Sequence, residues 1–418
     1  MGRALEAPAL VNFRALASLL LPAVPERTGV VLEADEHWSF DGRGIDADVV
    51  VWGRPPSPSG MPLATVSRAA LARERALHRL RRRPPHPWRL AWVHRLPPAT
   101  LRGGQRERAR AAMLGGALVQ LTTANPVLRV LDLAADAAGG IVPIRTFRAG
   151  SGGSLVTRLP MRDGSEAMLR VGAAHEPSDP SRGGAALAWL ATAGVPAVPR
   201  ALGSGRSGPA TWTLESRLPG DRAGRASDAM LDEVARFCAR LPASSGPPTA
   251  ATEDIGRIVL AYPRHASLLA RVSSFLRPVL RSLPAVSRHG DLWSGNILIE
   301  RGTLAGIVDW DNWHPLAVPG TDLLHALAMD EAIRSGRELG SVWLGAPWRS
   351  PAYQRLTAAY WPALDIWPDA ATLQAVGMAW WAGYVAHSIA LDPTLVADAR
   401  WTRLNVDDVL AVMERTVL

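Results

Sequence analysis

The stretch RHGDLWSGNIL, residues 288–298, places a His, an Asp and an Asn within eight residues of a chain rich in Ala, Leu and Arg. It continues into ILIE, the turn RGT and LAGIVDWD, which predict two short apolar strands joined by a tight turn. In an antiparallel hairpin, Asn296 before the first strand is expected across from Asp309 at the end of the second. Asp291 lies just upstream, and converging carboxylate and amide oxygens are the ligands that Mg²⁺ prefers. The stretch therefore predicts a polar, metal-binding site at one end of a hairpin.

The spacing of Asp291 and Asn296, D-x-x-x-x-N, is that of a kinase catalytic loop. In such a loop the Asp accepts the proton of the acceptor hydroxyl and the Asn holds a metal ion, with a second metal-binding carboxylate further along the chain. Upstream, residues 144–172 predict three short strands, with a glycine-rich turn at 150–154 and an Asp163-Gly164 hairpin turn. Arg170 lies on the third of these strands. The glycine-rich turn, the basic residue on the third strand and the Asp–Asn loop therefore follow one another along the chain in the order expected of a phosphate-binding site.

Together, HGDLWSGNIL (289–298) and GIVDWD (306–311) resemble the aminoglycoside phosphotransferase/choline kinase-like family. GTDLL (320–324) resembles a later segment of that family, LESRLPG (214–220) its hinge, and LAWLATAGVPAVPRALG (187–203) the helix and following strand of its small lobe. The resemblance covers about residues 143–418. It implies an α+β, two-lobed protein-kinase-like fold with the nucleotide in the cleft. The small β-rich lobe and hinge are expected at 141–220 and the large helical lobe at 221–418, preceded at 1–140 by an additional α/β-type domain of unknown role.

The resemblance also implies roles for individual residues, with ATP and Mg²⁺ as cofactors. Asp291 resembles the general base, and Asn296 and Asp309 resemble the Mg²⁺ ligands. Two further groups would contact the nucleotide. The loop over the phosphates comprises Gly150, Ser151, Gly152, Gly153 and Ser154, and the hinge beside adenine comprises Glu215, Ser216 and Arg217.

Two positions depart from the family's pattern. The chain contains no Lys, so Arg170 takes the place of the usual phosphate-binding Lys. A guanidinium can hold phosphate through two hydrogen bonds, but it is longer and wider than an ammonium. The helix Glu that normally pairs with this Lys is not evident, because its place falls near Gly183 or Gly184 and the nearest upstream acid is Glu176. The partner of Arg170 is thus not evident from the sequence.

Composition excludes several classes of protein. Hydrophobic residues make up 48% of the 418 residues, without any run of eighteen that would predict a membrane span. The single cysteine, Cys238, excludes an internal disulfide and fits a helix core, and the N-terminus lacks a clear signal peptide, so we expect a cytoplasmic location. The net charge is +8, but residues 1–140 carry a surplus of seven positive charges and the remainder is nearly balanced. Nucleic-acid binding is therefore an unfavoured hypothesis, confined to that segment.

The favoured hypothesis is an ATP-dependent small-molecule kinase whose acceptor is a hydroxyl of a sugar, an amino sugar, an amino alcohol or a similar metabolite. The alternative is a nucleotide-binding regulatory or scaffold protein of the same fold with weak or no transfer activity, which the missing Lys–Glu pair motivates. The sequence identifies neither the acceptor nor the oligomeric state.

Several nearby residues have structural interpretations. We expect His289 to order its loop and Asp322 to cap a helix or tie down the catalytic loop. Asp311 fits either a ligand or a solvated loop acid. The aromatic residues of the C-terminal part are expected in the core rather than on a ligand platform; they include Trp361, Trp380, Trp381 and Tyr384.

Overall fold

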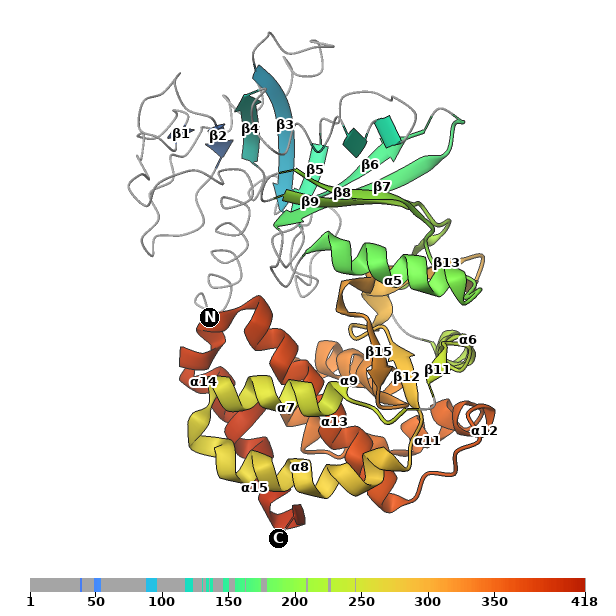
Figure 1. Cartoon of the computed structure of the whole chain (residues 1–418), viewed down its shortest axis with the longest axis vertical. Coiled ribbons are helices and arrows are strands. Elements are labelled where there is room, and N and C mark those ends of the chain that lie inside the picture. Colours follow the sequence, from blue (N-terminus) through green and yellow to red (C-terminus); the bar gives the residue numbers. More distant parts are fainter. Residues whose placement is uncertain are drawn as a thin grey trace. The chain divides into compact units, whose positions relative to one another are not determined.

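The computed structural model divides into two compact units, residues 1–184 with 201–217 and residues 185–200 with 218–418 (Figure 1). It describes residues 38–39, 49–53, 88–95, 117–122, 130, 133–134, 136–137, 146–149 and 155–417, apart from 162, 174–178, 208–209, 225–226 and 245. The predicted glycine turn at 150–154 lies outside these residues. The sequence also predicts helices at 64–83 and at about 104–118, and the first of these and most of the second lie outside them as well. Residues 117–118 are an exception, because they begin a strand where the sequence predicted the end of a helix.

The described part of the first unit contains one sheet with the strand order β1-β2-β4-β3-β5-β6-β7-β9-β8. The pairing of β3 with β5 is parallel, and the other pairs are antiparallel. The strands are β1 (Trp38–Ser39), β2 (Val49–Gly53), β3 (Trp88–Arg95), β4 (Ala117–Thr122), β5 (Thr146–Ala149), β6 (Leu155–Pro160), β7 (Glu166–Ala173), β8 (Ala201–Ser207) and β9 (Ala210–Ser216). Strands from before and after residue 140 share this sheet, and the domain boundary expected there stays a prediction.

The three predicted strands are present as β5, β6 and β7. On β7, Ala167, Leu169 and Val171 are fully buried, whereas Met168 and Arg170 on the opposite face are only partly covered. This alternation follows from the two-residue period of a strand. The turn between β6 and β7 contains Gly164 with φ 82°, the left-handed conformation that a tight hairpin turn requires.

The second unit is mainly helical and contains two small sheets of three strands each, β10-β13-β14 and β11-β12-β15, in its described residues. Its strands are β10 (Asp221–Arg222), β11 (Ala243–Ser244), β12 (Ala285–Arg288), β13 (Ile297–Glu300), β14 (Thr303–Ile307) and β15 (His314–Ala317). Its main helices are α6 (Asp228–Cys238), α7 (Ala250–Ala261), α8 (Ala266–Arg281), α9 (Thr321–Ser335), α10 (Leu339–Trp343), α11 (Pro351–Thr357), α12 (Tyr360–Ala363), α13 (Ala370–Leu391), α14 (Ala399–Thr402) and α15 (Asp408–Val417). Helix α5 (Pro180–Thr192) runs across the boundary of the two units. The predicted α+β class therefore holds for the described chain.

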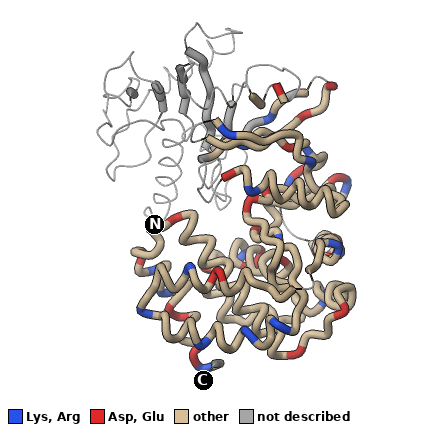
Figure 2. Tube along the Cα trace, viewed as in Figure 1, with Lys and Arg blue, Asp and Glu red and all other residues tan. Residues whose placement is uncertain are grey.

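Helix α13 forms the centre of the helical unit, since it is buried on nearly all sides along most of its length. As expected, Trp361, Trp380 and Trp381 belong to the core, and Tyr384 packs against it partly buried. Cys238 is buried on α6, also as expected. Basic and acidic residues are interspersed along the trace of this unit rather than gathered by sign (Figure 2). Among the described helices, none has the length and apolar character of a membrane span.

Candidate functional site

The loop that follows β12 carries the first predicted site residues, and its path depends on the backbone conformation of Gly290. Gly290 has φ 85°, and a Cβ at this position would overlap the main-chain carbonyl of Asn312. Both the left-handed backbone and the lack of space exclude other residues. The glycine between His289 and Asp291 therefore lets the loop pass directly against the segment that follows β14.

Asp322, at the start of α9, holds the backbone of this loop. Its Oδ2 accepts a hydrogen bond from the amide of His289 at 2.6 Å, and its Oδ1 accepts one from the amide of Gly290 at 2.9 Å. Of the two roles expected for Asp322, tying down the loop is the one observed. His289 is 1% exposed, receives a hydrogen bond from the amide of Asp291 on Nδ1, and lies 2.9 Å through Nε2 from the carbonyl of Val308. Its contacts are those of a loop-ordering residue.

The loop brings Asp291 and Asn296 into direct contact. The side-chain amide of Asn296 donates to the carboxylate Oδ2 of Asp291 at 3.0 Å and to its main-chain oxygen at 2.8 Å. Asn296 is 2% exposed, whereas the side chain of Asp291 is 31% exposed. With Nδ2 directed at Asp291, the Oδ1 of Asn296 is left for another partner. The pair thus presents one accessible carboxylate fixed by one buried amide.

The predicted hairpin is formed by β13 and β14, with a register that differs by one residue from the expected one. The amide of Val308, not Asp309, bonds to the carbonyl of Asn296 at 3.0 Å. Asp309 follows with φ 74° and ψ 60°, a left-handed conformation that non-glycine residues adopt at a cost of about 1–3 kcal/mol. The chain turns sharply at Asp309, between β14 and the 3-10 turn Trp310–Asn312. Asp311, in that turn, is only 8% exposed, so the solvated-acid interpretation was wrong.

One residue beside Asp291 was missed from the sequence. His325 of α9 is 8% exposed, and its Nε2 lies 3.4 Å from the carboxylate Oδ1 of Asp291. Its Nδ1 accepts a hydrogen bond of 3.1 Å from the indole of Trp380 on α13. The available signal was the position of His325 three residues after Asp322, which places both on one helix face.

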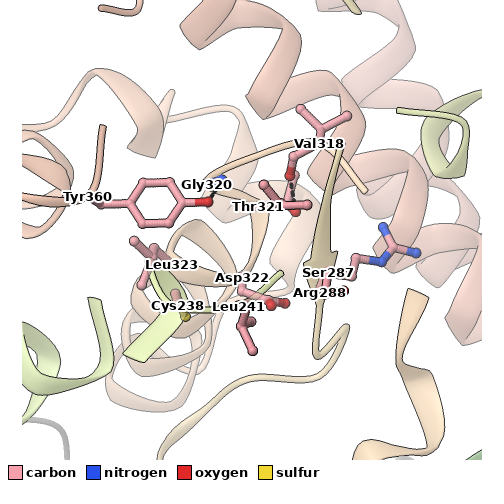
Figure 3. A pocket seen from close by; sticks show the side chains of 11 residues that line it. Cys238, Leu241, Ser287, Arg288, Val318, Gly320, Thr321, Asp322, Leu323 and Tyr360 are labelled. Atoms are coloured by element: carbon pink, nitrogen blue, oxygen red, sulfur yellow. Dashed lines mark hydrogen bonds between the residues drawn. The ribbon is translucent and has the colours of Figure 1, made fainter. Parts of the chain in front are cut away.

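A small cavity lies beside the start of the loop that carries Asp291 (Figure 3). Its volume is about 10 Å³, far below the roughly 300–1,000 Å³ of pockets for small molecules. Cys238 and Asp322 line it, together with Tyr360, whose hydroxyl accepts a hydrogen bond from the amide of Gly320 at 3.0 Å. Burial, reinforced by the charge of Asp322, raises the pKa of the Cys238 thiol well above its ordinary value and leaves it protonated and unreactive. The cavity belongs to the packing that supports the loop.

In the first unit, Arg170 of β7 faces Glu215 of the neighbouring strand β9. Its Nε lies 3.8 Å from Oε1 of Glu215, and their side chains are 11% and 9% exposed. Arg170 is therefore nearly buried beside an acid rather than exposed on the surface of the strand. At Gly184, where the helix Glu of the family was expected, a Cβ would lie 3.0 Å from Oγ1 of Thr213, so a larger side chain would displace its neighbours. An acid beside Arg170 thus comes from strand β9, whereas α5 contains no acid.

The other two expected hinge residues lie at the end of β9. Ser216 is its last residue and pairs with Ala167, and Arg217 makes an ion pair with Glu166 while its amide bonds to the carbonyl of the same residue at 3.0 Å. Their expected contacts with adenine stay a prediction, as do the phosphate contacts of Arg170.

Comparison with known proteins gave one family match. A profile of the phosphotransferase enzyme family matches residues 145–367, and no protein of curated function matches the chain. Solved structures that are similar to the chain include the following three. An aminoglycoside phosphotransferase from Streptomyces rimosus, in complex with ADP and streptomycin, is 20% identical over 60% of this chain and 96% of its own, with a TM-score of 0.40. A macrolide 2'-phosphotransferase from Brachybacterium faecium is 16% identical over 67% and 98%, with a TM-score of 0.42.

A thermostable mutant aminoglycoside phosphotransferase, in a ternary complex with AMP-PNP and hygromycin B, is 15% identical over 62% of this chain and 90% of its own, with a TM-score of 0.43.

Proposed function

Since the chain belongs to the phosphotransferase enzyme family, we propose that it is an ATP-dependent kinase that transfers the γ-phosphate to a hydroxyl of a small molecule. The acceptor class is a sugar, an amino sugar, an amino alcohol or a similar metabolite. The observation that carries the proposal is the accessible carboxylate of Asp291, fixed by the buried amide of Asn296 at 3.0 Å on a loop tied to α9. A general base needs this combination of access and fixed orientation.

In the proposed reaction, the acceptor oxygen forms a bond to the γ-phosphorus while the bond between that phosphorus and the β,γ-bridging oxygen breaks. ADP leaves with the electron pair of the broken bond, and Asp291 accepts the proton of the hydroxyl group. Phosphoryl transfer requires little covalent chemistry from a protein, because most of the catalysis comes from aligning the two substrates and from placing positive charge near the phosphates. Asp322 and Asn296 contribute by holding the loop and the base in place.

Asn296 and Asp309 are the proposed protein ligands of Mg²⁺. The free Oδ1 of Asn296 and the carboxylate of Asp309 are hard oxygen donors of the kind that the ion prefers. Bound there with ATP, the ion would neutralise charge on the phosphates. Throughout the described residues, no three His, Cys, Asp or Glu side chains converge as a metal site. Phosphate oxygens and water would therefore supply the remaining ligands.

The nucleotide-binding part of the proposal assigns the phosphates to residues 150–154 and to Arg170, and adenine to Glu215–Arg217. Arg170 and Glu215 form a nearly buried ion pair on adjacent strands. This pair supports Arg170 as the replacement for the missing Lys, because its acid partner limits the orientations open to the guanidinium.

Calorimetric titration of ATP, with and without Mg²⁺, tests the proposal on the wild type, Asp309→Ala, Asp291→Asn and the exposed control Asp232→Ala. We expect binding that requires Mg²⁺, is lost in Asp309→Ala and persists in Asp291→Asn and in the control. ATP turnover with water or screened alcohols as acceptor should fall about 10²- to 10⁴-fold in Asp291→Asn. Tight binding indifferent to Mg²⁺ and to Asp309 would favour the non-catalytic alternative, and absence of ATP binding would exclude both.

A further inference from the structure

His325 lies on the face of α9 that meets the catalytic loop. It follows Asp322 by three residues, so the two side chains project from the same side of the helix. Asp322 bonds to the loop backbone, and His325 reaches the carboxylate that the loop carries. The same turn of α9 therefore contacts both the backbone of the loop and the carboxylate of Asp291.

The contact with Trp380 determines which nitrogen of His325 bears the proton. An indole N–H can only donate, so the Nδ1 that receives it at 3.1 Å is unprotonated, and the neutral ring carries its proton on Nε2. This Nε2 is buried and makes no hydrogen bond within the described part of the protein. Its nearest acidic atom is Oδ1 of Asp291 at 3.4 Å, within ion-pair distance but without the direction of a formed hydrogen bond. The Nε2–H group is therefore close to Asp291 and can still donate a hydrogen bond.

The two oxygens of Asp291 are approached from different elements. Oδ2 accepts from Asn296 on the same loop, and Oδ1 faces His325 on α9. A carboxylate held only at Oδ2 can still rotate about its Cβ–Cγ bond. A second N–H at Oδ1 restricts that rotation and fixes the direction in which the remaining lone pairs point.

We propose that His325, oriented by Trp380, is a positioning residue for Asp291, an assignment that rests on the proposed role of Asp291 as the base. Its Nε2–H closes on Oδ1 when ATP and the acceptor bind and holds the carboxylate in line with the acceptor hydroxyl. The ring donates a hydrogen bond and takes up no proton in this step. A catalytic hydrogen bond that is long in the free enzyme and shortens in the substrate complex is the behaviour expected of such a site.

The first test is ATP turnover with water as the acceptor, comparing His325→Gln and His325→Asn. The terminal amide of Gln reaches the place of Nε2 and can donate to Asp291, whereas the shorter Asn reaches only the place of Nδ1. We expect kcat to fall about 10- to 100-fold in His325→Asn, as for a misplaced catalytic group. His325→Gln should recover most of that loss, and the KM for ATP should stay unchanged in both. Equal losses in the two variants, or no loss in either, would overturn the proposal.

The second test needs no activity. Nitrogen-15 spectra of histidine-labelled protein should show His325, identified by the signals that His325→Gln lacks, protonated on Nε2 and not on Nδ1. Asp291→Asn should shift its Nε2 resonance, and Trp380→Phe should shift Nδ1. A ring protonated on Nδ1, or one that does not respond to Asp291→Asn, would overturn the proposal. A wild type without ATP turnover would instead count against the proposed function, which separates the two failures.

Discussion

At the scale of single residues, Asp322 has the largest expected effect on the loop. Each of its carboxylate oxygens accepts one backbone N–H, from the buried His289 and the half-buried Gly290. In Asp322→Asn an amide NH₂ would face one of these donors, so one charged hydrogen bond is lost and one N–H is left unpaired. We expect the free energy of unfolding to fall by about 2–4 kcal/mol, measured by urea denaturation. The same change at the exposed Asp232 should cost less than about 0.5 kcal/mol, and equal stability of the two variants would contradict this role.

The same residues show what the sequence could predict. Asp291 and Asn296 were found because their contact lies within one short loop, so residue spacing determines it. The approach of His325 to Asp291 spans 34 residues and depends on how α9 docks, which no local pattern encodes. Glu215 was predicted as a hinge residue, whereas its side chain faces Arg170 because β7 and β9 are neighbours in the sheet. That β7 and β9 are neighbours follows from the order of the strands in the sheet and not from a local sequence pattern.

At the scale of helices, two glycines give opposite predictions. Gly256 lies inside α7 and is exposed, and a Cβ there would have no heavy atom within 4 Å among its surroundings. Gly256→Ala should therefore raise the free energy of unfolding by about 0.5–1 kcal/mol, through helix propensity. Gly377 lies inside α13, where a Cβ would come 2.5 Å from the ring of Trp348, so Gly377→Ala should lower it by about 1–3 kcal/mol. Urea denaturation of both variants measures the sign, and equal signs would contradict the packing of α13 described above.

At the scale of the whole molecule, an acid joins segments of the helical unit that lie far apart in the sequence. Asp407 lies 2.8 Å from Nε2 of His265 and accepts a hydrogen bond of 3.0 Å from Arg264. Partial burial opposes its charge, but the contacts with Arg264 and His265 outweigh burial and hold the pKa of Asp407 below its ordinary value. The unfolded chain therefore binds this proton at a higher pH than the folded protein. The stabilisation is present in full above the unfolded pKa of about 4 and is lost as the pH falls through the lower folded pKa.

For this reason Asp407→Asn should be less stable than the wild type at pH 7, and the difference should shrink toward pH 3. Urea midpoints of both proteins at pH 7, 5 and 3 measure it. A difference that stays constant or grows on acidification would show that the charge of Asp407 does not contribute in this way.

The ion pair between Arg170 and Glu215 bears on how the activity of the protein could be regulated. Both residues belong to adjacent strands of one sheet, so backbone hydrogen bonds between β7 and β9 set their separation. In a kinase whose acid partner comes from a mobile helix, displacing that helix breaks the pair and switches the enzyme off. Under the proposed function, the sheet therefore sets the orientation of Arg170, and a movement of α5 would not remove its acid partner.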